Sequence, residues 1–594
     1  MIRTPLRPLA RILSARAAGQ NPDVIEKENT RQRHEEMRDR LRQRAEGRLL
    51  VLGIFFVCAF TIVGGRMAVL ATSEPVEPRA SAPGAAISAA RADIVDRHGR
   101  ILATNFETHA LYAQPPLMID PERTVADLVS IFPDLDADRL RKDFTGNRKF
   151  VWIKRKISPE QMQAVHDIGD PGLLFGPREM RLYPNGKLAA HVLGGASFGK
   201  EGVSAAEVVG VAGIEKYFDD RLRDPALANQ PLQLSLDLTV QAAAERVLYG
   251  GMRLMNAKGA TSILMDVHTG EVISVVSLPN FDPNDRPRPV LTGDQSDSPL
   301  FNRSVQGVYE LGSTFKIFTA AHAIDLGVVN PSTVIDIKGP LRWGKFRIRD
   351  FRNYGDELSV EEIIVKSSNI GTARIAQMIG ADRQQDFLRQ LGMFEATPFE
   401  IVEAATGKPL LPRKWSELSA MTISYGHGLS TSPMHLAAGY AAIANGGHRI
   451  APTILRQRGP RLGHRVMSES AARAARLMLR KVVREGTASM GDVAGYAVGG
   501  KTGTADKPKP RGGYYEEKVI ATFATMFPAH DPKYVLVVTL DEPVETSGEE
   551  PRRTAGWTAV PVAAEMITRI APLLGLRPDV EPRVLSDIQL TSSQ

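Results

Sequence analysis

An uncharged apolar run near the N-terminus divides this chain into two unequal parts. Residues 49–65, LLVLGIFFVCAFTIVGG, contain no charged side chain. As an α-helix the run would be about 26 Å long, close to the roughly 30 Å thickness of a bilayer's hydrocarbon layer. Arg66 interrupts it before apolar residues continue to Ala71, and an arginine near the end of a span can keep its guanidinium at the headgroups. The sequence therefore predicts one membrane helix over residues 49–71.

The charge around this run predicts its orientation. Residues 1–48 hold twelve Lys or Arg against seven Asp or Glu, whereas the whole chain has a net charge of only +7. A basic flank stays in the cytoplasm, which places residues 72–594 outside the inner membrane, in the periplasm. A buried core helix and a cleaved signal peptide are the alternatives, but signal peptides have much shorter N-terminal regions than 48 residues.

Composition excludes several classes of protein. A length of 594 residues suggests two to four domains, and 43% hydrophobic with 24% charged residues is ordinary for folded chains. The basic excess lies in a short arm rather than on a folded domain, so we expect no nucleic-acid binding. The one cysteine, Cys58, lies in the apolar run, which excludes an internal disulfide and Cys-rich metal sites. We expect no metal and no cofactor.

The organisation we predict has two folded domains after the membrane helix. A proline-containing linker precedes a small domain of mixed short strands and helices, and a larger α+β domain follows, in which helices surround an antiparallel sheet. The predicted segments are a cytoplasmic basic arm (1–48), a transmembrane helix (49–71), a linker (72–90), a small pedestal or dimerisation-type domain (91–231), a catalytic domain (232–576) and a C-terminal tail (577–594).

Ser313 and Lys316 are the first candidates for chemistry. They stand three residues apart at the start of a helical run, so their side chains share one face. A serine becomes a nucleophile when a base lies beside it, and lysine is a base only when neutral. Burial and a second cation both lower a lysine pKa, and Lys501 is the candidate cation. A Ser-x-x-Lys match alone occurs by chance in a chain of this length, so further motifs must support it.

Two further motifs follow in order. Ser367 and Asn369 form Ser-x-Asn 54 positions after Ser313, between two helical runs, and Lys-Thr-Gly begins 134 positions later at Lys501. Residues 495–502, GYAVGGKT, also satisfy a phosphate-loop pattern. A phosphate loop must lead directly into a helix, whereas prolines and glycines follow here, so the pattern favours a strand. The ordered trio is typical of penicillin-binding proteins and serine β-lactamases.

The sequence resembles the class B penicillin-binding proteins, and within them the FtsI-type septal peptidoglycan transpeptidases of bacterial cell division. Leu311 stands where the family usually has proline, and Ser368 replaces the aspartate of the middle motif. The resemblance covers nearly the whole chain after Arg48, including RADIVDRHGRILA (91–103), RLYPNGKLAAHVLG (181–194), GVAGIEKYFDDRL (210–222) and SYGHGLSTSP (424–433).

The resemblance implies an α+β transpeptidase domain and an acyl transfer between peptidoglycan stem peptides. It implies the following roles: Ser313 as nucleophile, Lys316 as base, Ser367 as proton relay, Asn369 as a positioning residue, the backbone N–H groups of Ser313 and Thr504 as oxyanion hole, and Lys501, Thr502, Gly503 and Thr504 as the site for the substrate carboxylate. Lipid-linked precursor products would supply the substrate. The implied partners are a membrane-embedded glycosyltransferase and other division proteins.

Other functions remain as alternatives at this point. The same trio serves β-lactamases and penicillin sensors, and an elongation-type class B transpeptidase shares every motif. A non-catalytic, membrane-anchored binding protein is a further alternative. The anchor and the domain before residue 231 disfavour a hydrolase, and the intact nucleophile and base disfavour a purely structural role.

Overall fold

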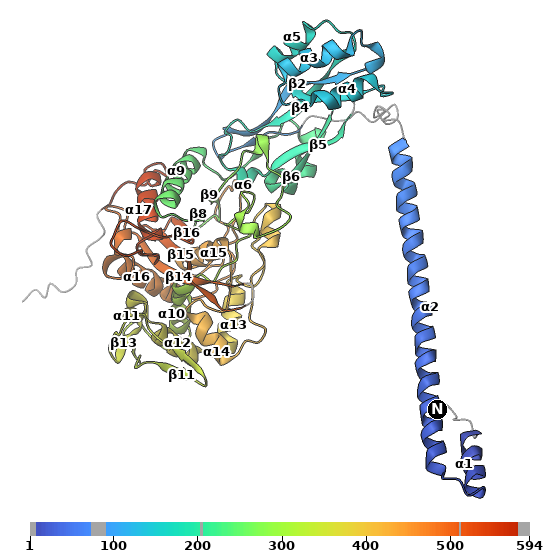
Figure 1. The fold of residues 1–594 in the computed structure, drawn as a ribbon. Coiled ribbons are helices and arrows are strands. Elements are labelled where there is room, and N and C mark those ends of the chain that lie inside the picture. Colours follow the sequence, from blue (N-terminus) through green and yellow to red (C-terminus); the bar gives the residue numbers. More distant parts are fainter. Residues whose placement is uncertain (1–6, 73–90, 202–205, 510–511, 580–594) are drawn as a thin grey trace, which may run out of the picture. The chain divides into compact units, whose positions relative to one another are not determined.

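A computed structural model describes residues 7–72, 91–201, 206–509 and 512–579 (Figure 1). Backbone contacts divide the chain into two compact units. The first comprises Met1–Glu77, Gln114–Val129 and Asp134–Val151, and the second comprises Pro78–Ala113, Ser130–Pro133 and Trp152–Gln594. The predicted linker lies almost entirely, and the predicted tail mostly, outside the described residues.

The first unit contains the predicted membrane helix. Helix α1 (Arg7–Ala17) precedes α2 (Pro22–Thr72), which runs unbroken for 51 residues. Within α2, Glu46–Met67 is long and apolar enough to cross a membrane, and none of that stretch is buried. The basic arm is therefore helical in its described part. Helix α4 (Ala137–Thr145) also belongs to this unit, and α3 (Pro121–Ile131) lies mostly in it.

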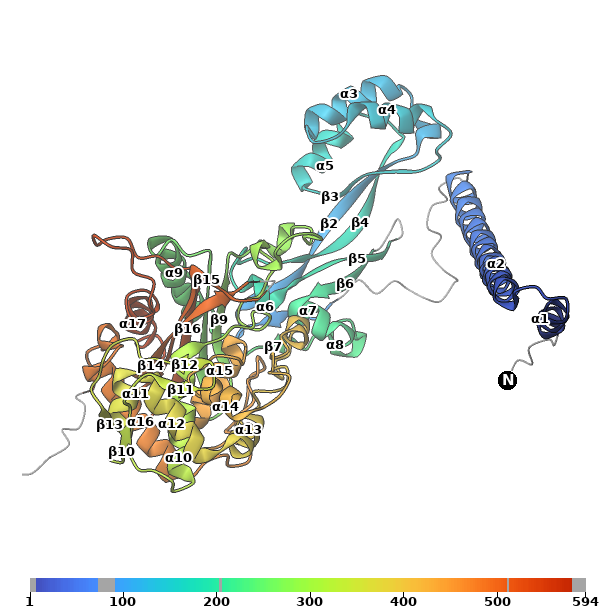
Figure 2. The ribbon, with the colours of Figure 1, turned by 60° about the horizontal axis from the view of Figure 1, so that its bottom comes forward.

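A long antiparallel pair of strands dominates the small domain of the second unit. Strand β2 (Ile101–Ala113) pairs with β4 (Leu173–Leu182) along ten residues, and Figure 2 shows the two side by side. Helix α5 (Pro159–His166) begins with Ser158 as its N-cap, in a capping box with Gln161. The remaining elements here are β1 (Ile94–Val95), β3 (Val151–Ile157), α6 (Ala190–Leu193), β5 (Gly195–Glu201), β6 (Ala206–Ala212), α7 (Gly213–Tyr217), α8 (Asp219–Leu222) and β7 (Leu232–Gln233).

A buried ionic cluster joins the elements of this small domain. The Glu215 carboxylate accepts hydrogen bonds from Arg91 Nε and Arg181 Nε, each at 2.7 Å, and the side chains of all three are almost fully buried. Arg91 also donates to Asp219 at 2.8 Å. Because these charges are removed from water, each depends on its partners for stabilisation. The cluster ties the segment that enters the domain to α7 and β4.

The larger domain is built on the predicted antiparallel sheet. Its strand order is β14-β15-β16-β8-β9, and every neighbouring pair is antiparallel. Strand β14 is thus an edge strand. The strands are β8 (Gly259–Asp266), β9 (Val272–Leu278), β14 (Gly499–Pro508), β15 (Tyr514–Phe527) and β16 (Tyr534–Asp541).

Helices cover this sheet, as predicted. Strand β16 is buried along nearly all its length, which requires cover on both faces. Helices α9 (Leu238–Leu254) and α17 (Ala559–Ile570) pack against each other and the sheet, while α15 (Pro433–Ala444) and α16 (Glu469–Glu485) form a second group on it. The other helices are α10 (Lys316–Asp325), α11 (Val360–Lys366), α12 (Asn369–Ile379), α13 (Ala381–Gln390) and α14 (Glu417–Ser424), and the short strands are β10 (Val334–Asp336), β11 (Leu341–Trp343), β12 (Phe346–Ile348) and β13 (Glu357–Ser359).

The ionic cluster yields a stability prediction. Replacing Glu215→Gln leaves two buried guanidinium groups short of a counter-charge, which costs about 3–5 kcal/mol. We expect a clearly lower melting temperature for the detergent-solubilised protein in calorimetry. Glu565→Gln, which removes an exposed partner of Arg569 on α17, is the control and should cost less than about 1 kcal/mol. Equal effects of the two substitutions would contradict this interpretation of the cluster.

Candidate active site

Three segments distant in sequence meet beside the edge strand β14. Ser313 lies in a 3₁₀ turn, Gly312–Phe315, that leads directly into α10, whose first residue is Lys316. Ser367 occupies the turn between α11 and α12, as the sequence predicts. Lys501 lies on β14. The structure therefore brings all three sequence motifs together.

The Ser367 hydroxyl is the meeting point of these segments. Lys316 Nζ and Lys501 Nζ each donate to Ser367 Oγ at 3.0 Å. Lys316 Nζ also donates to the Ser367 carbonyl at 2.5 Å. Throughout the described part of the chain, no hydrogen bond of the Ser313 hydroxyl is found, so in this state Lys316 is held by Ser367 while Ser313 stands one turn before it on the same segment.

Ser367 has an unusual backbone conformation. It ends α11 with φ 65° and ψ 43°, in the left-handed region that non-glycine residues rarely adopt. Such a conformation costs of the order of 1–3 kcal/mol and concentrates at functional sites. Here it turns both the carbonyl and the hydroxyl of Ser367 toward Lys316.

Burial shifts the ionisation of both lysines. Lys316 and Lys501 are each fully buried. Burial lowers the pKa of Lys501 to about 7. Burial, and then the charge of Lys501, lower the pKa of Lys316 well below its usual value, while the charge of Asp350 acts in the opposite direction. The second cation expected from the sequence is thus in place, and a neutral lysine near pH 7 becomes accessible.

Two glycines allow the segment that carries Ser313 to approach β14. A Cβ on Gly503 would lie 2.2 Å from the Leu311 carbonyl oxygen, and Gly312 has φ +55°. A Cβ on Gly312 would lie 2.8 Å from the Thr504 carbonyl oxygen. Only glycine therefore fits at positions 312 and 503. The close approach brings the backbone of Ser313 near that of Thr504 on an edge strand, where N–H groups facing away from β15 have no strand partner.

The side chains around the middle motif include a carboxylate that sequence reasoning missed. Asp350 accepts from the Asn369 N–H at 2.5 Å, from the Ile370 N–H at 3.0 Å and from the Ser368 hydroxyl at 2.7 Å. It caps α12 from a loop about 17 residues before Ser367, with no local pattern to announce it. The Asn369 amide donates to the Arg349 carbonyl at 3.0 Å, so within the described residues its bond is not to Lys316.

The threonines of the last motif have different partners. The Thr502 hydroxyl lies 2.7 Å from that of Thr487, a residue the sequence did not single out. Thr504 Oγ1 accepts from the Ala555 N–H at 3.0 Å, which leaves its own proton available to an acceptor in the site. A carboxylate is such an acceptor.

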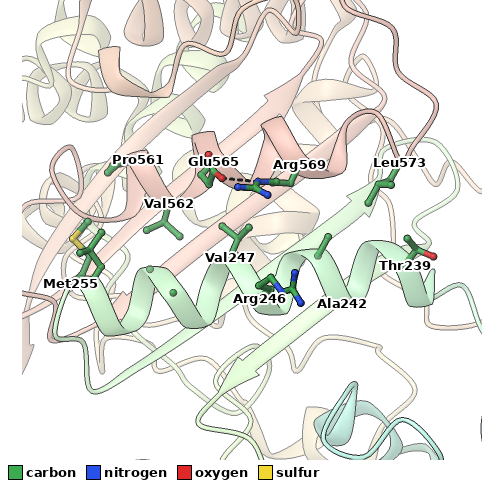
Figure 3. Close-up of a pocket in the computed structure, with 14 residues that line it drawn as sticks. Thr239, Ala242, Arg246, Val247, Met255, Pro561, Val562, Glu565, Arg569 and Leu573 are labelled. Atoms are coloured by element: carbon green, nitrogen blue, oxygen red, sulfur yellow. Dashed lines mark hydrogen bonds and ion pairs between the residues drawn. The ribbon is translucent and has the colours of Figure 1, made fainter.

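The structure excludes two other locations or types of active site: a phosphate loop at Lys501 and the cavity between α9 and α17. Strand β14 continues to Pro508, so no helix follows Lys501 and the phosphate-loop alternative is wrong. A cavity of about 760 Å³ lies between α9 and α17 (Figure 3), but its lining is largely apolar, with side chains such as Val247, Val562 and Leu573. None of the motif residues lines that cavity.

Comparison with known proteins agrees with this geometry. Residues 260–566 match the penicillin binding protein transpeptidase domain, and residues 86–225 match the penicillin-binding protein dimerisation domain. The chain therefore belongs to the penicillin-binding proteins with a transpeptidase domain, an enzyme class.

Individual relatives cover most of the chain. A probable peptidoglycan D,D-transpeptidase FtsI from Caulobacter vibrioides is 35% identical over 83% of each chain. The peptidoglycan D,D-transpeptidase FtsI of Escherichia coli is 27% identical, over 83% of this chain and 85% of its own. Within the penicillin-binding proteins the chain therefore belongs to the FtsI-type class B proteins, as the motif resemblance predicts. The crystal structure of penicillin-binding protein 3 from Mycobacterium tuberculosis in complex with aztreonam matches with a TM-score of 0.64 and 25% identity, over 84% of this chain and 99% of that one.

The lysine pair yields a prediction for pH dependence. If Lys316 must be neutral to act, acylation rises with pH through its pKa. Lys501→Gln removes a charge that lowers this pKa, so Lys316 stays protonated to higher pH and the midpoint of the profile moves upward. The measurement is the rate of acylation by a fluorescent penicillin between pH 5 and 9.

Lys507→Gln provides the matched control for this prediction. Lys507 is another lysine of β14, and it pairs with Asp541 and Glu542 instead of the motif residues. Its replacement should leave the midpoint where it is. A midpoint in Lys501→Gln that stays in place or moves to lower pH would contradict the proposed coupling, whatever happens to the maximal rate.

Proposed function

We propose that this protein cross-links peptidoglycan stem peptides at the division septum through an acyl-enzyme on Ser313. The observation that carries the proposal is the contact of Lys316 and Lys501 with one hydroxyl, Ser367 Oγ, each at 3.0 Å. Family membership gives the reaction class, peptidoglycan D,D-transpeptidation. The septal assignment rests on the FtsI type of the relatives.

The first half of the proposed reaction forms an ester. Ser313 Oγ attacks the carbonyl carbon of the penultimate D-Ala, and neutral Lys316 takes the hydroxyl proton. The N–H groups of Ser313 and Thr504 stabilise the tetrahedral oxyanion. As the C–N bond breaks, Ser367 gives its proton to the leaving nitrogen of the terminal D-Ala and is reprotonated from Lys316.

The second half consumes that ester. The amine of a neighbouring stem peptide attacks the acyl carbon and loses a proton to Lys316, and the C–O bond to Ser313 breaks as its oxygen regains a proton. The product is a new amide cross-link and free enzyme. Lys501, Thr502, Gly503 and Thr504 would bind the carboxylate of the departing D-Ala in the first half, where protonated Lys501 would pair with its charge. Asn369 would hold the substrate amide, after exchanging its present bond to a backbone carbonyl.

The nucleophile and base assignments are tested by covalent labelling. Ser313→Ala should fold normally and take no fluorescent penicillin, because the attacking oxygen is gone. Lys316→Ala should slow acylation by about 10²- to 10⁴-fold, as is usual for loss of a general base. Peptide mapping by mass spectrometry locates the adduct. An adduct on another serine, or unchanged acylation of Lys316→Ala, would contradict these roles.

Position in the cell is the second part of the proposal. Glu46–Met67 would cross the inner membrane once, with the N-terminus in the cytoplasm and both folded domains in the periplasm. We also propose that the basic arm, the membrane helix, the linker, the small domain and the catalytic domain end at residues 48, 71, 90, 231 and 576, respectively. Depleting the protein in cells should give filaments if it acts in division and rounded cells if it is an elongation-type enzyme.

The anchor should do more than hold the protein at the membrane. A chain beginning at Ala82 and exported to the periplasm should be soluble and still acylated by β-lactams, because every residue of the site lies after residue 309. We expect it to fail to support growth in place of the intact protein, since the helix also contacts partners in the membrane. Full complementation by this shortened chain would reduce the helix to a tether.

A division of labour with a glycosyltransferase is the last part of the proposal. The small domain lacks the E-D-x-x-F-x-x-H-x-G segment of bifunctional relatives. We therefore propose that glycan strands come from a membrane-embedded partner of the division machinery. With lipid-linked precursor the protein alone should make no glycan, and with that partner it should make cross-links that disappear in Ser313→Ala. Long glycan made by this protein alone would contradict the proposal.

A further inference from the structure

Glu310 lies three residues before Ser313, and its carboxylate accepts hydrogen bonds from two segments distant in sequence. Its carboxylate is nearly buried and accepts from the Gly428 N–H at 2.7 Å. The Tyr514 hydroxyl donates to it, with O–O distances of 3.0 and 3.1 Å. His427 Nδ1 lies 3.1 Å from its Oε2. One carboxylate thus bridges three parts of the chain.

The first bridged segment is the loop of residues 425–428, which fits closely against the residues before Ser313. The Gly312 N–H donates to the Gly426 carbonyl at 3.2 Å. A Cβ on Gly426 would lie 1.9 Å from the Gly312 carbonyl oxygen, so any larger residue would push the two segments apart. Glu310 binds the next two residues of this loop, His427 and Gly428.

The second bridged segment is the strand pair β14–β15. Tyr514 is the first residue of β15 and pairs with Pro508 at the end of β14. The same β14 carries Lys501 and Thr504. The hydrogen bond from Tyr514 to Glu310 therefore links the end of the strand pair to the segment that carries Ser313. This link is a second contact between the two, several residues along β14 from the place where Gly503 packs against Leu311.

The protonation states suit a lasting contact. Burial raises the pKa of Glu310, but bonds from His427 and Gly428 outweigh it and the pKa is lowered, so the carboxylate stays charged. Burial and the charge of Glu310 raise the pKa of Tyr514 to about 12, so the phenol keeps its proton. A phenol that donates to a carboxylate makes a charge-assisted hydrogen bond, which is stronger than one between neutral groups.

We propose that Glu310 is a positioning residue which, through Tyr514 and the loop 427–428, holds β14 at the correct distance from Ser313. The inference rests on the proposed acyl-enzyme function and adds residues to it. The two oxyanion N–H groups lie on the two segments that Glu310 joins. Loss of the hydrogen bonds to Glu310 would move these two donors apart. Because the donors stabilise the oxyanion more strongly than the ground-state carbonyl, their separation would slow acylation.

This placement predicts a particular kinetic signature. Loss of an interaction made mainly in the transition state lowers the rate of acylation at saturating β-lactam but leaves the dissociation constant of the initial complex nearly unchanged. A merely structural role of Glu310 and Tyr514 would instead lower the melting temperature and the active fraction. Stopped-flow acylation by a fluorescent penicillin separates the two constants.

The central variant is Tyr514→Phe in the full-length protein. It removes one hydroxyl from a half-exposed ring, so we expect normal folding and an acylation rate about five- to tenfold lower, the size typical of one lost hydrogen bond. Tyr515→Phe is the matched control. Lys509 and Lys518 lie over the Tyr515 ring, which the substitution keeps, and its rates should equal those of the unmodified protein.

A double-mutant cycle tests whether the two residues act through one contact. Glu310→Ala should lower the rate more than Tyr514→Phe, and Glu310→Gln, which retains an acceptor for Tyr514, should recover much of the loss. In a Glu310→Ala background, Tyr514→Phe should have no further effect, because the shared contact is already gone.

The outcomes separate this inference from the proposed function. If the unmodified protein takes no label at Ser313, the proposed function is wrong. If it is labelled but Tyr514→Phe acylates at the same rate, or the two substitutions multiply independently, the positioning role is wrong and the proposed function stands.

Discussion

The burial of two lysine amines against one serine hydroxyl is the constraint on which the site depends. An ammonium group in a protein interior is costly, and two close together are more so. Lys316 and Lys501 avoid much of that cost if at least one loses its proton. The folded protein can thereby hold a neutral amine, the form that the proposed mechanism requires of Lys316, although free lysine is almost entirely charged at neutral pH.

This arrangement depends on how closely three backbone segments approach one another. Ser367 adopts a left-handed conformation to turn its polar atoms to Lys316, and glycines at 312, 426 and 503 remove the Cβ atoms that would block contact. The antiparallel sheet contributes an edge strand, β14, against which the segment that carries Ser313 packs. Glu310 adds a second fastening on that segment through Tyr514.

Much of the fold was predictable because its signals are local. The apolar run of α2, the Ser158 cap of α5 and the apolar strands β8, β9, β15 and β16 each follow from a few neighbouring residues. The three motifs were predictable as a set, since their order agrees with their expected settings at a helix start, in a turn between two helices and on a strand. The residue ranges given for the two folded domains, 91–231 and 232–576, remain predictions.

The rest of the site depends on contacts between residues far apart in sequence. Asp350 caps α12 from a loop, Thr487 lies beside Thr502, and Glu310 meets residues more than a hundred positions away. No spacing rule joins such residues, because tertiary packing brings them together. The continuous helix through the basic arm was also missed, since its many charges carry no strong apolar period.

The central claim is that the folded site holds a neutral lysine near pH 7. The most direct measurement is an NMR pH titration of the full-length protein labelled with ¹³C at the lysine ε-carbon, with Lys316 and Lys501 assigned from the signals lost in Lys316→Arg and Lys501→Arg. The account predicts that the pair begins to lose protons far below the usual lysine pKa of about 10.4, with at least one amine neutral by about pH 8. Two amines that both stay protonated to about pH 10 would contradict it.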